Sequence, residues 1–197
     1  MSFNLLLASS SPYRAELLKR LRIPFSQASP DIDETPLADE TPQEYVLRLA
    51  KEKARALHTR HPDSWIIGSD QTCVIDGQPV GKAGTEEKAL GQLKRVKGQK
   101  ITFLTGLCLL SPAGDEYTLT EPFHVHFNDL SDEALKRYIS IEQPLDCAGS
   151  FKVEGLGITL FSALEGRDMN ALIGLPMIGL CELMRQAGLE PLALAEA

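Results

Sequence analysis

Short apolar runs and helix-start signals alternate along the first third of the chain. Residues 5–8 form a brief apolar run, and a short buried strand is predicted over residues 4–8. Three serines follow, and a proline then stands where the first helical residue is expected, so a helix is predicted over residues 12–21. A second helix is predicted over residues 42–58, because Thr41 can cap it while Glu44 reaches back to close a capping box.

Strand and helix patterns continue through the middle of the chain. Two apolar segments, 65–68 and 72–75, are interrupted by a polar triplet and are expected to be separate strand segments. The Asp-Gly pair after the second segment signals a tight turn. A helix is expected over residues 86–97, with Thr85 as its cap and Gly98 at its end.

The remaining pattern sets the fold class. Residues 101–110 and 116–127 are rich in β-branched and aromatic residues, and the turn-forming sequence between them predicts a hairpin. Ser131 is expected to cap another helix, and the last helix is expected to begin at Pro176. Because strand–helix units are combined with an antiparallel hairpin, the sequence predicts a mixed α/β (α+β) fold. No repeat or linker interrupts it, so residues 1–197 are expected to form a single domain.

Composition and charge narrow the class of partner. The chain has 197 residues, of which 43% are hydrophobic, as is typical of a soluble globular domain. Its net charge of −7 argues against binding to DNA, RNA or anionic lipid, since those partners favour a basic surface. No apolar stretch approaches the roughly 18–20 residues of a membrane span, and no signal-peptide pattern is present. We therefore expect a cytoplasmic protein that binds neither a nucleic acid polymer nor a membrane.

The cysteines and two strand histidines are interpreted as structural. The four cysteines are far apart and form no C-x-x-C pair, so neither a zinc site nor a disulfide framework is indicated, and buried, unreactive thiols are expected. His124 and His126 alternate with core residues and are expected to face solvent. The cysteines are Cys73, Cys108, Cys147 and Cys181.

Two basic residues lie on helix faces that are otherwise apolar. Arg14 precedes Leu17, Leu18 and Leu21 by three, four and seven residues, and Lys53 lies among apolar residues in the same way. A long side chain that reaches past the apolar face to water is the alternative for each residue. Two such residues on successive helices favour a shared anionic pocket. The serines before the first helix fit a phosphate cradle at the helix N-terminus, although an ordinary helix cap is the favoured explanation when they are taken alone.

Acidic residues complete the set of candidate groups. Asp70 follows the apolar segment 65–68, and the ends of sheet strands often carry catalytic groups, but a turn aspartate is the alternative. Asp33 and Glu34 lie in an expected loop and supply oxygen ligands suited to Mg²⁺, unless they are simply solvated. Lys82 follows a predicted turn that could return a cation toward Asp70, and its alternative is a solvated loop lysine.

Seven short motifs, in order along nearly the whole chain, resemble those of the Maf family of nucleotide pyrophosphatases. They are Ser9-Ser10-Ser11-Pro12-Tyr13-Arg14, Asp33-Glu34-Thr35-Pro36, Lys51-Glu52-Lys53-Ala54, Gly68-Ser69-Asp70-Gln71, Gly81-Lys82, Cys147-Ala148-Gly149-Ser150-Phe151 and Gly174-Leu175-Pro176. The resemblance implies an elongated mixed sheet with flanking helices, related to the inosine triphosphate pyrophosphatases, and a cleft between two lobes. It also implies a nucleoside triphosphate substrate, a divalent cation (Mg, Mn or Co) and a possible homodimer.

The resemblance also assigns roles to individual residues. Asp70 is the expected general base, and Glu34 and Asp70 are the expected metal ligands. The expected substrate-binding residues, which offset phosphate charge, are Ser9, Arg14, Lys53 and Lys82.

Three further positions resemble the branch of the family that hydrolyses 7-methyl-GTP. Gln71 and Glu154 match that branch, and Tyr13 stands where it often has Trp. A carboxylate at Glu154 can accept two hydrogen bonds from guanine, and an aromatic ring can stack on the cationic methylated base. The alternatives are the same reaction on dTTP, UTP or another modified nucleotide, and a non-catalytic nucleotide-binding regulator of septum formation.

Overall fold

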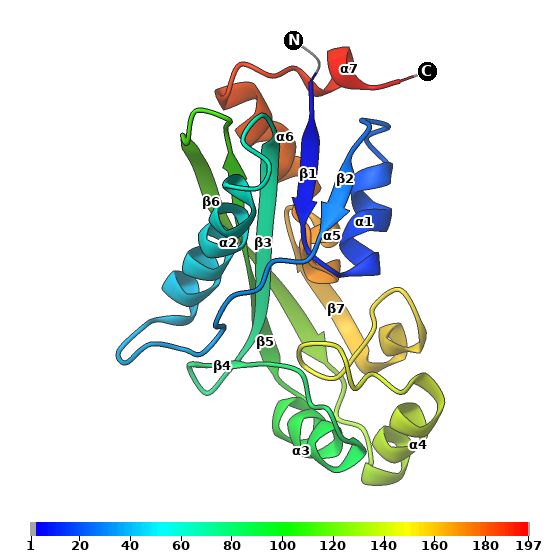
Figure 1. The fold of residues 1–197 in the computed structure, drawn as a ribbon. Coiled ribbons are helices and arrows are strands. Elements are labelled where there is room, and N and C mark those ends of the chain that lie inside the picture. Colours follow the sequence, from blue (N-terminus) through cyan, green and yellow to red (C-terminus); the bar gives the residue numbers. More distant parts are fainter. Residues whose placement is uncertain (1–2, 197) are drawn as a thin grey trace.

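A seven-stranded sheet with helices packed against both faces runs through the molecule (Figure 1). The computed structural model describes residues 3–196. The strands are β1 (Leu5–Ala8), β2 (Ser26–Ala28), β3 (Trp65–Ile75), β4 (Gln78–Val80), β5 (Lys100–Leu110), β6 (Glu116–Phe127) and β7 (Phe161–Gly166). The helices are α1 (Pro12–Lys19), α2 (Pro42–His58), α3 (Glu86–Val96), α4 (Asp132–Glu142), the 3₁₀ helix η1 (Leu156–Leu160), α5 (Met169–Ile173), α6 (Met177–Gln186) and α7 (Pro191–Leu194).

The strand order is β2-β1-β3-β5-β6-β7, and β4 pairs with the end of β3. β1 is parallel to both β2 and β3, whereas all the other pairs are antiparallel. The predicted mixed α/β architecture is therefore confirmed, and so is the hairpin formed by β5 and β6. Within the described residues, no helix is long and apolar enough to cross a membrane.

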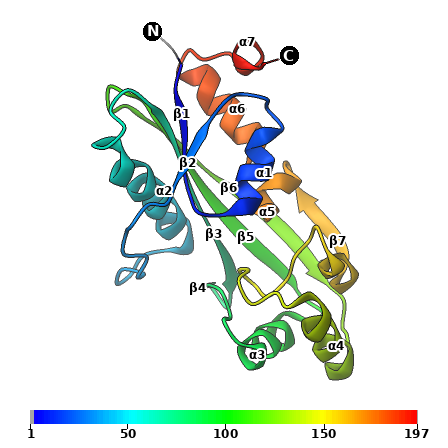
Figure 2. The same ribbon diagram turned by 45° about the vertical axis from the view of Figure 1, so that its right-hand side comes forward.

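Helices cover the sheet on opposite faces because side chains alternate along each strand. On β1, Leu5 and Leu7 pack into the core formed with α1 and α6, while Leu6 and Ala8 pack into the core formed with α2. A third core lies at the other end of the sheet, where α3 and α4 pack (Figure 2). Four edge-to-face contacts between phenylalanine rings stabilise this third core, with Phe151 in three of them.

Two glycines allow α2 to lie directly on the sheet. A Cβ at Gly68 would overlap the Ala50 carbonyl oxygen, and a Cβ at Gly106 would overlap the Val46 carbonyl oxygen. Any larger residue would push the helix away from β3 and β5. This close approach also sets the direction of the side chains on the following turns of α2.

The predicted helix caps are confirmed. The hydroxyl oxygens of Ser11, Thr41, Thr85 and Ser131 each accept a hydrogen bond from the backbone N–H three residues later. The capping box of α2 is complete. Several boundaries differ from the predicted ones. α1 ends at Lys19 rather than Leu21, and α3 ends at Val96 rather than Lys97. The helix α6 was expected to be the last, but α7 follows it.

The expectation that 65–68 and 72–75 are separate strand segments was wrong. β3 is a single strand of 11 residues, and its polar triplet pairs with β5 at Leu107, Gly106 and Thr105. The partner strand supplies backbone hydrogen bonds throughout, and this outweighs the weak strand preference of Asp and Gln. Asp70 therefore lies in the middle of a strand rather than at its end.

Several short elements were missed because they depend on distant partners. β2 has only three residues, none of them strongly β-forming, and it exists as the parallel neighbour of β1. β4 is equally short, and β7 pairs with the far end of β6. Local pattern does not reveal such pairings.

The cysteine and histidine predictions hold only in part. Cys73 and Cys108 are buried, and burial raises the pKa of each thiol to about 12. Cys147 and Cys181 are partly exposed, contrary to expectation, because one lines a cavity and the other lies on an outer face of α6. The two strand histidines alternate with buried core residues, as predicted, but they are only partly exposed because they hydrogen-bond Thr102 and Glu165.

Substitution of Gly68 by alanine is expected to destabilise the fold, because α2 must move away from the sheet. We expect Gly68→Ala to lower the free energy of unfolding by about 3 kcal/mol, measured by urea denaturation. The matched control is Gly91→Ala, since Gly91 lies inside α3 with open space beside it. That change is expected to raise the free energy of unfolding by about 0.5–1 kcal/mol. Equal effects from the two substitutions would contradict this account of the packing.

Candidate active site

The sheet has a gap beside the middle of β3. β1 pairs with β3 only as far as Ala8 opposite Gly68, and β4 begins to pair with β3 only at Cys73. Residues 69–72 therefore have a neighbouring strand on the β5 side alone within the described structure. The carboxyl end of a parallel strand such as β1 is a common place for ligand binding. A cavity of about 420 Å³ lies at this gap.

The nine residues to which the family resemblance gives a role all line this one cavity, whereas Asp33, the other acidic candidate of the loop, does not line it and accepts hydrogen bonds from Thr35. The nine come from the turn after β1, α1, the loop after β2, α2, β3, the segment after β4 and the segment before η1. The residues are Ser9, Tyr13, Arg14, Glu34, Lys53, Asp70, Gln71, Lys82 and Glu154. The structure thus brings the whole set together, while their roles in binding and catalysis stay predictions.

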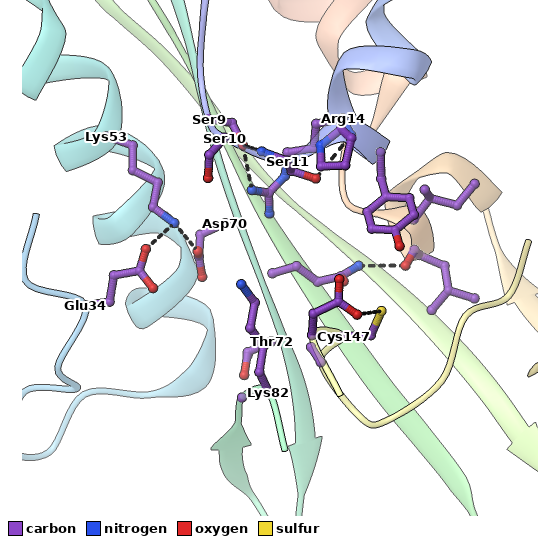
Figure 3. A pocket seen from close by; sticks show the side chains of 18 of the residues that line it. Ser9, Ser10, Ser11, Arg14, Glu34, Lys53, Asp70, Thr72, Lys82 and Cys147 are labelled. Carbon is purple, nitrogen blue, oxygen red and sulfur yellow. Dashed lines mark hydrogen bonds and ion pairs between the residues drawn. The ribbon is translucent and has the colours of Figure 1, made fainter. Parts of the chain in front are cut away.

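Lys53 joins the two carboxylates at the centre of the cavity (Figure 3). Its Nζ lies 2.6 Å from Oδ1 of Asp70 and 2.8 Å from Oε1 of Glu34. Asp70 and Lys53 are both buried, whereas the Glu34 side chain is 56% exposed. An ammonium group has three N–H donors, so one remains to bind a ligand beside the two carboxylates.

The surrounding cations keep Glu34 ionised. Burial by itself would raise the pKa of Glu34, but its hydrogen bond and charge interaction with Lys53, together with Lys82 and Arg14, hold that pKa below its ordinary value. Lys82 points into the same part of the cavity (Figure 3). An isolated antiparallel β-bridge to Ala148, which also lines the cavity, holds the backbone of Lys82.

Arg14 is held in place by uncharged groups. Its Nε donates to the Gly174 carbonyl oxygen at 2.7 Å, and its Nη1 donates to Oγ of Ser9 at 3.3 Å. It forms no ion pair with any described residue at salt-bridge distance, and burial lowers its pKa despite the opposing influence of Asp70 and Glu34. A desolvated guanidinium without a paired carboxylate is suited to bind an external anion such as phosphate.

Hydrogen bonds fix the turn that contains Ser9 and Ser11, next to Arg14. Oγ of Ser9 accepts a hydrogen bond from the Ser11 N–H at 3.1 Å, and the hydroxyl of Ser11 caps α1. Gln27 on β2, which does not line the cavity, donates from Nε2 to the Ser9 carbonyl oxygen at 2.7 Å. The two interpretations of these serines, as a helix cap and as a phosphate cradle, are thus compatible. Ser11 makes the cap, while Ser9 contacts Arg14.

The carboxylates fit a divalent cation that also binds the substrate. Asp70 and Glu34 already share one positive charge, that of Lys53, so their oxygens converge on a single region. Within residues 3–196, no group of three or more His, Cys, Asp or Glu side chains is arranged to hold a metal by itself. Mg²⁺ commonly binds through one or two carboxylates and completes its coordination with substrate phosphates and water. This donor set meets that requirement.

A second group of lining residues is aromatic and acidic. Tyr13 is half-buried there, and burial, followed by the charges of Asp146 and Cys147, raises its pKa, so the ring is a neutral phenol. Glu154 and Asp146 are both among the lining residues. Nε2 of Gln71 donates to the carbonyl oxygens of Ala171 and Leu172, at 2.6 and 3.0 Å, and so ties β3 to α5.

Three of the lining or supporting residues that were not selected from the sequence are Tyr45, Asp146 and Gly174, each of which contributes a polar group. Tyr45 lies eight residues before Lys53 on α2, and this helical spacing on one face could have indicated it. Asp146 immediately precedes the motif that begins at Cys147, and its acidic side chain is the only feature in the sequence that could have indicated it. Gly174 belongs to a recognised motif, but its role in holding Arg14 depends on a backbone oxygen that sequence does not place.

Comparison with known proteins places the chain in a family. The family model for "Maf-like protein" matches residues 4–187. The chain is 54% identical over 187 residues to a protein of Alcanivorax borkumensis named 7-methyl-GTP pyrophosphatase, covering 94% of this chain and 95% of the relative.

Solved structures are similar at a lower level. One is a nucleoside-triphosphatase (dITP/XTP pyrophosphatase) from Mycobacterium abscessus, with a TM-score of 0.42 and 19% identity over 65% of this chain and 76% of that one. Another is a HAM1 protein from Coxiella burnetii, with a TM-score of 0.48 and 16% identity over 66% and 75%. The family assignment does not depend on these structures. The sequence match extends over nearly the whole chain and includes every element around the cavity, and the chain therefore belongs to the Maf family.

Proposed function

We propose that the protein is a nucleoside triphosphate pyrophosphatase that hydrolyses 7-methyl-GTP to 7-methyl-GMP and pyrophosphate. The observation that carries the proposal is the grouping of charged and aromatic residues that line the cavity. Arg14, Lys53 and Lys82 lie near Glu34 and supply positive charge there, whereas Glu154 lies near the aromatic ring of Tyr13. A polyphosphate suits the first group, and a cationic methylated purine suits the second.

In this reaction Asp70 acts as the general base. It accepts a proton from the water that attacks the α-phosphorus, and the bond from that phosphorus to the bridging oxygen breaks as pyrophosphate leaves. Lys53 orients the Asp70 carboxylate through their 2.6 Å contact. Arg14 and Lys82 offset the charge that develops on the phosphate oxygens. Ser9 supports this arrangement by holding Nη1 of Arg14.

The proposal includes a divalent cation, of which Mg, Mn and Co are the candidates. Glu34 and Asp70 would hold it, and it would supply further neutralisation of the phosphate charge. With the nucleotide bound, Lys53 remains beside both carboxylates and presents its third N–H to a phosphate oxygen. The cytoplasmic location and the homodimer stay predictions made from the sequence.

Base recognition is assigned to three residues. Glu154 accepts hydrogen bonds from the N1–H and the amino group of guanine, a pair of donors that thymine and uracil lack. Tyr13 stacks on the methylated ring, whose positive charge its π face favours. Gln71 fixes α5 beside the base through its bonds to the Ala171 and Leu172 carbonyls. The name of the 54%-identical relative supports the same substrate.

Replacement of Asp70 by asparagine is expected to remove turnover while leaving the protein folded. Asn cannot accept the proton, so kcat for pyrophosphate release from 7-methyl-GTP should fall about 10²–10⁴-fold. Lys53 keeps Glu34 as a partner at 2.8 Å, so the thermal unfolding curve should remain cooperative. A variant that is folded and retains more than a tenth of wild-type kcat would show that Asp70 is not the base.

The Glu154→Gln variant tests base recognition. An amide oxygen lacks the negative charge and the second acceptor, so kcat/KM for 7-methyl-GTP should fall about 10–100-fold, while kcat/KM for dTTP should barely change. The control is Glu87→Gln, because Glu87 is exposed on α3 and lies outside the cavity. The wild-type protein is assayed on canonical and modified triphosphates with Mg²⁺, Mn²⁺ or Co²⁺. Comparable wild-type turnover of dTTP and 7-methyl-GTP would contradict the guanine-specific assignment.

A further inference from the structure

The loop that carries Glu34 has no regular structure of its own. Residues 29–40 contain no helix or strand, and the Glu34 side chain is more than half exposed. A carboxylate on such a loop has no fixed position unless other groups hold the backbone. The positioning of Glu34 beside Asp70 therefore depends on the contacts between this loop and α2.

Arg48 on α2 makes most of those contacts. Its Nε and Nη2 donate to the two carboxylate oxygens of Glu40, at 2.6 and 2.8 Å, in a bidentate pair. Nη2 also donates to the Thr35 carbonyl oxygen at 3.2 Å, one residue beyond Glu34. Glu40 in turn accepts from the Leu37 N–H at 3.1 Å, so the loop is fixed at three points.

Tyr45 holds the loop at Glu34 itself. Its hydroxyl donates to the Glu34 carbonyl oxygen at 3.0 Å. The Arg48 guanidinium lies over the Tyr45 ring, 5.7 Å from the ring centroid, so the two side chains also support each other. The two contacts hold the consecutive carbonyls of Glu34 and Thr35 from one face of α2.

Arg48 is not placed to bind substrate. Four of its five N–H donors are accounted for by Glu40, Thr35 and Glu52, and it does not line the cavity. Its hydrogen bonds to Glu40, first among several influences, hold the pKa of that carboxyl below its ordinary value, so the pair stays charged at neutral pH. These features separate Arg48 from Arg14, which has no carboxylate partner at salt-bridge distance.

We propose that Arg48 and Tyr45 are positioning residues that hold the Glu34 loop against α2, so that Glu34 and Asp70 can share a divalent cation. The inference rests on the proposed function, in which Glu34 is a metal ligand. It adds a role for Arg48, which does not line the cavity, and for the hydroxyl of Tyr45, which bonds the loop backbone although the residue also lines the cavity. Loss of the hydrogen bonds from Arg48 and Tyr45 to the loop should weaken metal binding more than it slows the chemical step at saturating metal.

The experiment measures Mn²⁺ binding directly, by the electron paramagnetic resonance signal of free Mn²⁺ with the protein saturated by the α,β-methylene analogue of 7-methyl-GTP, after subtraction of the Mn²⁺ that the analogue binds without protein. We expect Arg48→Met to raise the Kd for Mn²⁺ about tenfold or more, as is typical when a group supporting a metal ligand is removed. Arg48→Lys, which cannot form the bidentate pair, should show an intermediate rise. Tyr45→Phe keeps the ring and loses only the hydroxyl, and its Kd should rise about fivefold.

The matched control is Arg55→Met. Arg55 lies on the same helix and also pairs with a carboxylate, that of Glu116, but it has no contact with the loop. Its Kd for Mn²⁺ should equal that of the wild type. In parallel, kcat of Arg48→Met on 7-methyl-GTP should recover to within about threefold of wild type as Mn²⁺ is raised to saturation.

The outcomes separate this inference from the proposed function. An unchanged Kd for Mn²⁺ in Arg48→Met and Tyr45→Phe, or a wild-type protein that binds no Mn²⁺, overturns the positioning role. An equal rise in Arg55→Met also overturns it, because the effect would then reflect general destabilisation. A wild-type protein that binds Mn²⁺ as expected but releases no pyrophosphate from any triphosphate overturns the proposed function alone.

Discussion

The contact between Lys53 and Asp70 is the constraint on which the rest of the site depends. Both groups are buried, and a buried charge is costly unless a partner of opposite sign lies within hydrogen-bonding distance. That distance is met because α2 lies directly on the sheet, where Gly68 and Gly106 leave room for its backbone. The close packing of α2 on the sheet thus fixes the position of Asp70, the candidate general base, which lies two residues after Gly68 on β3.

The gap in the sheet converts this pair into a site. Had β1 continued beside β3, or had β4 begun earlier, strand pairing would have covered the segment that contains Asp70. Instead, the segments that leave the sheet at the gap bring Arg14 and Lys82 toward the same space. Lys53 and the carboxylates of Glu34 and Asp70 form one group of lining residues, and Glu154 lies near Tyr13 in another. These two groups link the fold to the proposed choice of a methylated purine triphosphate.

Much of this arrangement could be predicted from local patterns. The caps at Thr41 and Ser131 and the hairpin of β5 and β6 need only neighbouring residues, and the misplaced charges of Arg14 and Lys53 on apolar faces indicated an anionic partner. The continuity of β3 through Asp70 could not be predicted, because it depends on β5. The tethers from Arg48 and Tyr45 were equally hidden, since an irregular loop gives no pattern that places its carbonyl groups.

In the proposed reaction these groups direct water to the α-phosphorus of a nucleoside triphosphate. Hydrolysis of 7-methyl-GTP in water enriched in ¹⁸O, followed by mass spectrometry of both products, identifies the phosphorus atom that is attacked. One ¹⁸O atom is expected to enter 7-methyl-GMP and none to enter pyrophosphate. Label in pyrophosphate, or release of labelled inorganic phosphate in place of pyrophosphate, would show attack at a different phosphorus and would contradict the role given to Asp70.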